Sequence, residues 1–342
     1  MQAAQLHGYH QPFSVGSVPD PSPGPGEVLI RVAGSGACHS DLHVRDGAFD
    51  GLAWPAFPWI LGHENAGYVA ALGPGATGVE VGEPVCVYGG WGCGTCRLCL
   101  TGDEHLCDLM RWGGMGVDGG YAELLVVPST RHLVRLGDEL DPVLAAPLTD
   151  AGLTPYRAVK KALPHLIPGT TAVTIGVGGL GQFALQFLEL MSPSRVVALD
   201  IDAAKRAKAL ELGAEVALDP SDPDIGAQLR SHTGADGAAV VLDFVGATST
   251  LAVASEVVGP RGLIVLVGLA GGQLDFSYLG LGAEARVTSS RWGNRAELDE
   301  VIALARQGLL TIDVERHPLS DINAVFERLE HGGVTGRAVL VP

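Results

Sequence analysis

A glycine-rich turn between two apolar runs constrains the fold of this chain more than any other feature. Residues 172–175 (AVTI) form a short β-branched run that is typical of a buried parallel strand, and the turn 176–181 (GVGGLG) follows directly. Residues 182–190 carry apolar side chains at helical spacing, and residues 196–199 form a second apolar run that ends at Asp200. A G-x-G-x-x-G turn between strand and helix, followed about twenty residues later by an acid, predicts a dinucleotide-binding βαβ unit.

The residue types in this unit suit a dinucleotide. Gly176 permits the tight turn, Gly178 lets the backbone approach a pyrophosphate, and Gly181 allows helix and strand to pack closely. The first amides of the helix then face the phosphates. Asp200 can accept hydrogen bonds from the adenosine ribose hydroxyls and would repel a 2′-phosphate, so NAD is favoured over NADP. A plain loop is the alternative in a chain with 48 glycines, but it leaves the strand, the helix and the acid unexplained.

Length and composition exclude several classes of protein. A chain of 342 residues is too long for one ordinary core, so we expect two domains. A hydrophobic content of 47% with 18% charged residues indicates a globular interior rather than disorder. The formal charge of -16 argues against nucleic acid or an anionic membrane as a partner. We find no signal peptide and no apolar run of membrane-spanning length, so we expect a cytoplasmic protein.

The middle of the chain alternates predicted helices and strands. From Leu153 to about residue 290 this rhythm is the one that a doubly wound parallel sheet requires. Residues 240–244 (VVLDF) and 263–267 (LIVLV) are further buried strands, whose carboxyl ends should rim the cofactor crevice. In the glycine turn and along this rim we expect cofactor contacts from Gly179, Leu180, Val245 and Leu269.

Residues 1–128 differ, because they contain short β-strand patterns with glycine punctuation and a compact set of four cysteines. The four are Cys93, Cys96, Cys99 and Cys107. Their C-x₂-C-x₂-C-x₇-C spacing suits one tetrahedral structural zinc with no open coordination position. A ferredoxin-type cluster is the alternative, but the last interval and the missing proline fit it poorly. Cys86, in an apolar run, is expected to be an inert core thiol.

A second candidate metal site combines Cys38 and His63. Cys38 lies in a loop after the predicted strand 27–33 (EVLIRVA), and His63 belongs to the later triplet 62–64 (GHE). A thiolate and an imidazole suit zinc, and a catalytic zinc keeps three protein ligands with one open position. A lone cysteine or histidine is more often structural, but beside a nucleotide-binding fold we favour a catalytic role.

These motifs, in this order, resemble those of the zinc-dependent medium-chain alcohol dehydrogenases over nearly the whole chain. Within that family the chain is most similar to bacterial NAD-dependent secondary alcohol dehydrogenases, which carry a similar PLTDAGLTPY segment (147–156) and a similar WGCGTC segment (91–96). The resemblance implies an α/β protein with two domains. A β-rich GroES-like catalytic domain would comprise residues 1–151 and 293–342, and a Rossmann NAD-binding domain residues 152–292. It further implies two zinc ions per subunit and a homodimer or homotetramer.

The resemblance also implies roles for the metal ligands and their neighbours. Cys38 and His63 would hold the catalytic zinc. The third ligand would be Asp150, where many members of the family have a cysteine and some bacterial members an aspartate; a carboxylate is an acceptable zinc ligand. Glu64 would lie behind the metal and enter its coordination transiently, and Asp41 would orient His63 through a hydrogen bond. The alternative for Asp150 is a helix-capping or loop carboxylate.

The remaining implied roles concern the proton and the cofactor. Ser40 would take the proton from the alcohol, and His43 would pass it to solvent. Cofactor contacts are implied for His39 and Arg337 at the pyrophosphate, Lys205 at the ribose, and Thr154 and Val267 at the nicotinamide. A solvated side chain is the alternative for His43 and Lys205, and core packing is the alternative for Thr154 and Val267.

The predicted reaction is the reversible oxidation of an alcohol, with secondary alcohols preferred, to a ketone or aldehyde with NAD⁺. Bulky side chains that are candidates for the walls of the substrate pocket are Trp54, Trp59, Trp91, Leu269 and Trp292, each with core packing as the alternative. Such walls would suit a medium-sized secondary alcohol or an aryl ketone. Three other functions stay open: oxidation of primary alcohols or polyols, zinc-free reduction on the same fold, and non-catalytic sensing of NAD.

Overall fold

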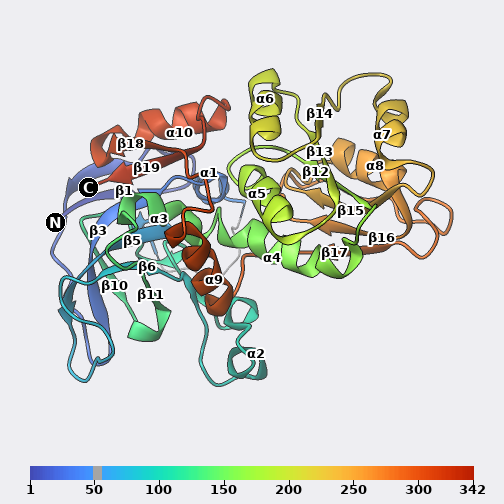
Figure 1. The fold of residues 1–342 in the computed structure, drawn as a ribbon. Coiled ribbons are helices and arrows are strands. Elements are labelled where there is room, and N and C mark those ends of the chain that lie inside the picture. Colours follow the sequence, from blue (N-terminus) through green and yellow to red (C-terminus); the bar gives the residue numbers. More distant parts are fainter. Residues whose placement is uncertain (49–55) are drawn as a thin grey trace. The chain divides into compact units, whose positions relative to one another are not determined.

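The structure, a computed structural model, describes residues 1–48 and 56–342. The chain divides into two compact units, seen in Figure 1: unit 1 comprises Met1–Leu153 and Gly293–Pro342, and unit 2 comprises Thr154–Trp292. The polypeptide therefore leaves unit 1 once, builds unit 2, and returns to complete unit 1. Among the described residues, no helix has both the length and the apolar character needed to cross a membrane.

Unit 2, all of whose residues are described, is built on one parallel sheet. Its strand order is β14-β13-β12-β15-β16-β17, and every neighbouring pair runs parallel. The strands are β12 (Thr171–Ile175), β13 (Arg195–Leu199), β14 (Val216–Leu218), β15 (Ala238–Asp243), β16 (Val258–Leu266) and β17 (Arg286–Ser289). The helices are α4 (Leu153–Ala162), α5 (Gly181–Met191), α6 (Ala203–Glu211), α7 (Ile225–Thr233) and α8 (Thr248–Val257).

The chain winds outward from β12 in both directions, which makes the end of β12 the switch point where such sheets bind ligands. The predicted doubly wound sheet is therefore confirmed. One detail differs from the predicted rhythm, because β16 and β17 are joined by a loop where strict alternation would place a helix.

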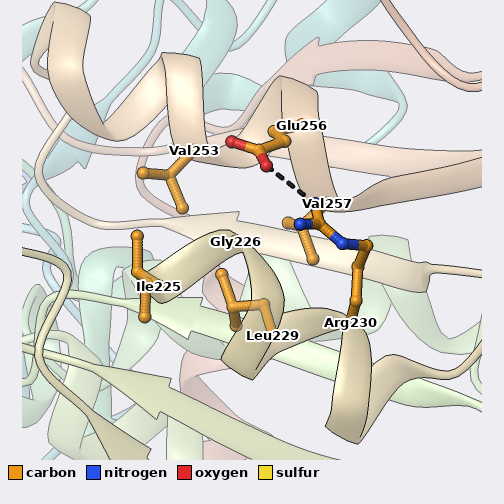
Figure 2. A pocket seen from close by; sticks show the side chains of 7 residues that line it. All are labelled: Ile225, Gly226, Leu229, Arg230, Val253, Glu256 and Val257. Atoms are coloured by element: carbon orange, nitrogen blue, oxygen red, sulfur yellow. Dashed lines mark hydrogen bonds and ion pairs between the residues drawn. The ribbon is translucent and has the colours of Figure 1, made fainter. Parts of the chain in front are cut away.

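The outer helices of unit 2 pack with little free space. Figure 2 shows Ile225 and Leu229 of α7 facing Val253 of α8, while Arg230 and Glu256 form an ion pair of 2.9 Å beside them. The hollow that these side chains leave has a volume of about 10 Å³, which is room for one water at most. This hollow is a gap in the packing and not a ligand site.

Unit 1 is β-rich, as its sequence predicts. Among its described residues, a large sheet has the order β11-β6-β5-β3-β19-β18 with β10 paired to β3, and smaller sheets have the orders β2-β1-β4 and β7-β8-β9. The strands of the large sheet are β3 (Val28–Gly36), β5 (Glu64–Leu72), β6 (Pro84–Val87), β10 (Leu124–Val127), β11 (Leu133–Arg135), β18 (Val314–Pro318) and β19 (Arg337–Val341). Those of the smaller sheets are β1 (Gln2–Leu6), β2 (Ser14–Ser17), β4 (Trp59–Ile60), β7 (Gly90–Trp91), β8 (Arg111–Gly113) and β9 (Gly116–Val117).

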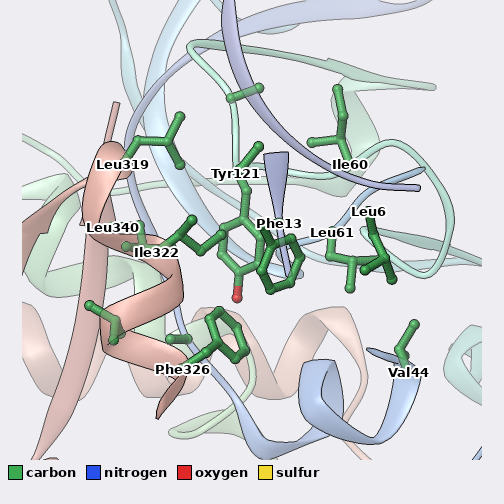
Figure 3. Close-up of a cluster of buried hydrophobic side chains, with 14 of the residues drawn as sticks. Leu6, Phe13, Val44, Ile60, Leu61, Tyr121, Leu319, Ile322, Phe326 and Leu340 are labelled. Atoms are coloured by element: carbon green, nitrogen blue, oxygen red, sulfur yellow. The ribbon is translucent and has the colours of Figure 1, made fainter. Parts of the chain in front are cut away.

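Short helices connect and cover these sheets. They are α1 (His39–Arg45), α2 (Arg97–Leu100), α3 (Pro142–Ala145), α9 (Arg295–Arg306) and α10 (Ile322–Glu330). One core cluster lies between α1, α10 and the first strands, and Figure 3 shows Tyr121 and Phe13 at its centre with Phe326 beside them. Tyr121 is fully buried in this cluster, although its hydroxyl is polar. The partners of that hydroxyl lie at the candidate metal centre described next.

Candidate metal centres and cofactor-binding loop

The first candidate centre lies entirely in unit 1 and joins three segments that are distant in sequence. Donor atoms of Cys38, His63, Glu64 and Asp150 all lie within 4.8 Å of one another. Cys38 is the N-cap residue of α1, His63 and Glu64 mark the start of β5, and Asp150 follows the 3-10 helix Ala146–Thr149. Asp150 Oδ2 lies 3.7 Å from Cys38 Sγ and 3.2 Å from His63 Nε2. The structure thus brings the three predicted ligands together.

This donor set fits a zinc ion. Thiolate, imidazole and carboxylate are the three ligand types that zinc accepts from proteins. Cys38, His63 and Glu64 are buried, and Glu64 Oε2 has no hydrogen-bond partner among the described residues. A buried anionic oxygen without a partner is costly unless a cation or a proton balances it. Asp150 is partly exposed, whereas the other three donors are buried.

Asp41 connects the histidine and the cysteine of this centre. Its Oδ1 lies 3.2 Å from His63 Nδ1, and its Oδ2 accepts from the Cys38 backbone amide at 3.2 Å and from the Tyr121 hydroxyl at 2.7 Å. Burial opposes a charge on His63, but the Asp41 charge together with hydrogen bonds to Asp150, Asp41 and Cys38 raises the His63 pKa well above its ordinary value. Burial and the Asp41 charge likewise raise the pKa of Tyr121, so its hydroxyl stays protonated and donates.

Glu64 and Arg337 form a buried ion pair behind this centre. Burial raises the pKa of Glu64 to about 7, with Asp150 adding to the rise and Arg337 opposing it. Glu64 lies opposite Gly36 in the β3–β5 register, and a Cβ on Gly36 would overlap the Glu64 carboxylate, so only glycine fits there. The sequence predicts Arg337 as a pyrophosphate contact; the structure pairs its Nη2 with Glu64, which the sequence analysis missed.

Helix α1 carries the predicted proton-transfer residues. Ser40 Oγ lies 3.7 Å from Cys38 Sγ in the first turn of the helix. His43 is half-buried and follows three residues later, so both side chains lie on one helix face. His39 is exposed at the start of the same helix.

The four-cysteine lobe forms a second candidate centre in unit 1. Donor atoms of Cys93, Cys96, Cys99 and Cys107 lie within 4.8 Å of one another, with Sγ–Sγ distances of 3.9 Å between Cys93 and Cys99 and 3.7 Å between Cys96 and Cys107. Sulfurs placed 2.3 Å from a tetrahedral zinc are about 3.8 Å apart. Hydrogen bonds from Thr95 and backbone amides lower the pKa of Cys93 to about 5, whereas burial raises that of Cys99 to about 12. Four thiolates this close would repel one another unless a cation lay between them, and the number and spacing of the sulfurs fit zinc.

Arg131 and His132 fix this lobe to the rest of unit 1. The Arg131 guanidinium donates to the Gly92 carbonyl at 3.1 Å and pairs with Glu104 at 3.4 Å, so it reaches both ends of the lobe. His132 Nε2 lies 3.2 Å from Arg131 Nε and accepts from it. Burial, with the charges of Arg131 and Arg295 adding to it, lowers the pKa of His132 to about 3, so the imidazole is neutral and can accept.

This neutral histidine predicts a loss of stability in acid. The unfolded chain binds a proton at His132 below a pH of about 6.5, but the folded protein does not until about pH 3. The folded state therefore keeps its full stability above pH 6.5 and loses about 2 kcal/mol from this group by pH 5. The His132→Gln variant cannot titrate at this position. Denaturant unfolding at equal zinc content should therefore show a smaller loss of unfolding free energy between pH 7 and pH 5 for this variant than for the unsubstituted protein. An equal loss in both proteins would show that His132 does not cause the acid sensitivity.

The glycine turn of unit 2 has the geometry that the fingerprint predicts. Gly176 has a φ of 88°, which favours glycine, and a Cβ on Gly181 would overlap the Gly176 carbonyl oxygen. A Cβ on exposed Gly178 would meet nothing within 4 Å, so the chain itself leaves room there. Asp200 Oδ2 accepts from the Val177 amide at 2.7 Å. Its oxygens keep further lone pairs for a ribose.

The opposite rim of the switch point is held by the buried carboxylate of Asp243, which lies at the carboxyl end of a strand predicted to rim the crevice. Asp243 Oδ1 accepts from the Val245 and Gly246 amides at 2.9 Å each, and its Oδ2 accepts from the Thr250 hydroxyl at 2.8 Å. These bonds shape the loop after β15.

The predicted cofactor contacts within unit 2 differ in their exposure. Val245 and Lys205 are half-buried, Thr154 and Val267 are buried, and Leu269 is exposed.

The described tryptophans proposed as pocket walls are buried. Trp91 packs among Val28, Leu125 and other residues of a core cluster of the large sheet and donates to the Tyr88 carbonyl at 2.8 Å, so it is a core residue and not a wall of the metal centre. Trp59 belongs to the cluster around Tyr121. Trp292 is buried at the end of unit 2, and Trp54 lies outside the described residues.

Comparison with known proteins agrees with both units. Residues 24–138 match the alcohol dehydrogenase GroES-like domain, and residues 179–307 match the zinc-binding dehydrogenase model. The chain is 36% identical over 355 residues to an NAD-dependent alcohol dehydrogenase of Sulfurisphaera tokodaii, covering 100% of both. It is 35% identical over 345 residues to a D-arabinose 1-dehydrogenase (NADP(+)) of Saccharolobus solfataricus, covering 100% of this chain and 97% of that protein.

A solved structure also matches the whole chain. The crystal structure of the alcohol dehydrogenase from Aeropyrum pernix matches with a TM-score of 0.94 and 39% identity, covering 100% of both chains. The predicted combination of a GroES-like domain with a Rossmann-type parallel sheet is thereby confirmed. With its Cys/His/Asp/Glu centre, its four-cysteine lobe and its glycine turn, this chain belongs to the zinc-dependent medium-chain alcohol dehydrogenase family.

Proposed function

We propose that this protein is an NAD-dependent alcohol dehydrogenase that reversibly oxidises secondary alcohols to ketones. The observation that carries the proposal is the largely buried donor set of Cys38, His63 and Asp150, with Glu64 beside it, in a chain whose second unit has a dinucleotide fingerprint. A zinc bound there supplies Lewis acidity, which lowers the pKa of an alcohol and polarises a carbonyl in the reverse direction. NAD⁺ supplies the hydride acceptor.

The chain's own residues prepare the centre for this chemistry. Asp41 accepts the Nδ1 proton of His63, which fixes the orientation of the ring and would leave Nε2, 3.2 Å from Asp150 Oδ2, to a bound metal. Arg337 pairs with Glu64 and opposes the rise of the Glu64 pKa that burial causes, so it favours the charged carboxylate.

Two residues of helix α1 move the proton. We assign to Ser40, beside Cys38 Sγ, the step that takes the proton from the substrate hydroxyl. His43, on the same face of the helix and partly exposed, then hands that proton to solvent. In the reverse direction the same two groups deliver a proton to the carbonyl oxygen.

The cofactor preference follows from Asp200. Its carboxylate is held at the glycine turn by the Val177 amide, where it would face the adenosine ribose and repel a 2′-phosphate. The preference for secondary alcohols is supported by the resemblance to secondary alcohol dehydrogenases. We also propose that the protein is cytoplasmic and forms a homodimer or homotetramer. Light scattering on the purified protein measures the number of subunits.

A substrate panel tests the proposed function. Secondary alcohols of four to eight carbons, primary alcohols, polyols and aldoses are offered with NAD⁺ or NADP⁺, and ketones with NADH, while the nicotinamide absorbance is followed. We expect the highest kcat/KM with a secondary alcohol and NAD⁺. Faster turnover of a polyol or an aldose, the substrate class named for the Saccharolobus solfataricus relative, would move the assignment to sugar oxidation. Binding of NAD without turnover of any alcohol or ketone would favour a sensor.

A further inference from the structure

We propose that Tyr121 is a positioning residue for the catalytic metal ligands and that it acts through the Asp41 carboxylate. The inference rests on the proposed function only in taking Cys38 and His63 as ligands of a working centre. Tyr121 follows a Gly-Gly turn outside every motif that the sequence analysis used. Its hydroxyl bonds Asp41 and the Gly36 carbonyl, neither of which is a predicted metal ligand.

The Tyr121 hydroxyl bonds the Asp41 carboxylate, which in turn contacts both Cys38 and His63. Tyr121 Oη lies 2.7 Å from Asp41 Oδ2 and 3.1 Å from the Gly36 carbonyl oxygen. The same Oδ2 accepts from the backbone amide of Cys38, while Oδ1 lies 3.2 Å from His63 Nδ1. The Tyr121 hydroxyl therefore fixes the rotation of the carboxylate on which the His63 ring and the Cys38 backbone both depend.

Packing holds the Tyr121 ring in place, so the position of its hydroxyl is fixed. The ring centroid lies 6.0 Å from that of Phe13 and 5.9 Å from that of Phe326, both edge to face. Figure 3 shows these three side chains grouped in the core. The Tyr121 backbone amide donates to the Leu61 carbonyl at 3.0 Å. A Cβ on Gly62 would lie 2.7 Å from the ring, so the ring packs directly against the backbone that leads into His63.

Removal of the Tyr121 hydroxyl is expected to turn the Asp41 carboxylate. Asp41 is fully buried, and without Tyr121 its Oδ2 keeps, among the described residues, the 3.2 Å bond from the Cys38 amide alone. A buried carboxylate with an unsatisfied oxygen turns toward any remaining donor. Because His63 Nδ1 and the Cys38 amide are the donors within reach, such a turn changes the angle of the imidazole at the metal.

The experiment uses the full chain loaded with zinc, and the same protein with Co²⁺ exchanged into the catalytic centre. The variant is Tyr121→Phe, which removes one oxygen. The matched control is Tyr88→Phe, because Tyr88 is also fully buried and its hydroxyl donates to a backbone carbonyl, that of Gly293, at 3.0 Å. Three quantities are measured: the rate of zinc release to a chromogenic chelator, the visible absorption bands of Co²⁺, and kcat with KM for NAD⁺.

For Tyr121→Phe we expect zinc release about 10-fold faster, shifted Co²⁺ bands and a kcat about 10-fold lower at unchanged KM for NAD⁺. Tyr88→Phe should leave the Co²⁺ bands and zinc release as in the unsubstituted protein. Addition of Tyr121→Phe to an Asp41→Asn background should change the bands no further. Co²⁺ bands and release rates equal to those of the unsubstituted protein would overturn the inference, and so would equal shifts in Tyr88→Phe.

Two outcomes separate this inference from the proposed function. The metal measurements need no substrate, so a protein inactive on every alcohol still tests Tyr121. If Tyr121→Phe does not fold, Asp41→Asn alone decides, because unchanged Co²⁺ bands in that variant would show that the carboxylate transmits nothing to the metal.

Discussion

Replacement of Cys38 or His63 by alanine is expected to lower alcohol turnover by about 10³-fold or more, since a metal centre contributes several kcal/mol to transition-state stabilisation. The loss should come with zinc content falling from about two ions per chain to about one. NAD binding, measured by cofactor fluorescence, should stay close to that of the unsubstituted protein, because the glycine turn and Asp200 belong to unit 2.

A matched control for this prediction lies elsewhere in unit 1. Cys86 is a fully buried thiol outside both donor sets, so Cys86→Ala should keep both zinc ions and full turnover. Normal turnover in Cys38→Ala, with one zinc ion lost, would show that this cysteine does not serve the reaction.

The second large effect is expected at the glycine turn. A Cβ on Gly181 would overlap the Gly176 carbonyl oxygen, so Gly181→Ala must displace the turn itself. We expect NAD affinity to fall by about 10²-fold or more, because the turn amides that face the pyrophosphate move with the backbone. Calorimetric titration with NADH measures the affinity, and zinc content should remain at the level of the unsubstituted protein.

Gly178→Ala separates strain in the chain from obstruction of the cofactor. At this position a Cβ meets nothing within 4 Å, so the variant should unfold at the same temperature as the unsubstituted protein. It should still bind NADH more weakly, since the new methyl group occupies the space into which the pyrophosphate enters. Unchanged affinity in Gly178→Ala would mean that the pyrophosphate does not approach this glycine.

The elements of unit 2 were predictable because their patterns are local. The apolar run before Gly176 and the acid after the second strand fall within one βαβ unit, whose spacing depends on strand and helix geometry alone. The four cysteines are likewise close in sequence, so their spacing suffices to predict one shared ion. Only the loop between β16 and β17 departs from the rhythm, since nothing in a parallel sheet obliges an edge strand to follow a helix.

The surroundings of the catalytic ligands were less predictable, because they depend on contacts between distant segments. Tyr121 reaches Asp41 from 80 residues away, and Arg337 reaches Glu64 from 273 residues away. No periodic pattern marks either partner. A glycine at position 36 was the one indication in the sequence, since a residue without a side chain suggests that something packs against its backbone. Trp91 is a different case, because its size suggested the wall of a substrate pocket, whereas it packs in the core beside the large sheet.

The position of β19 in the chain has a consequence for biosynthesis. Strands β18 and β19 are translated after all of unit 2, yet β19 pairs with the last residues of β3 and carries Arg337. On the ribosome, unit 2 can therefore fold while the catalytic half is still missing its last strands and the Glu64 carboxylate has no counter-charge. A nascent chain halted before β19 would therefore lack the strand partner of Ser35 and Gly36, which lie just before the Cys38 ligand in the chain.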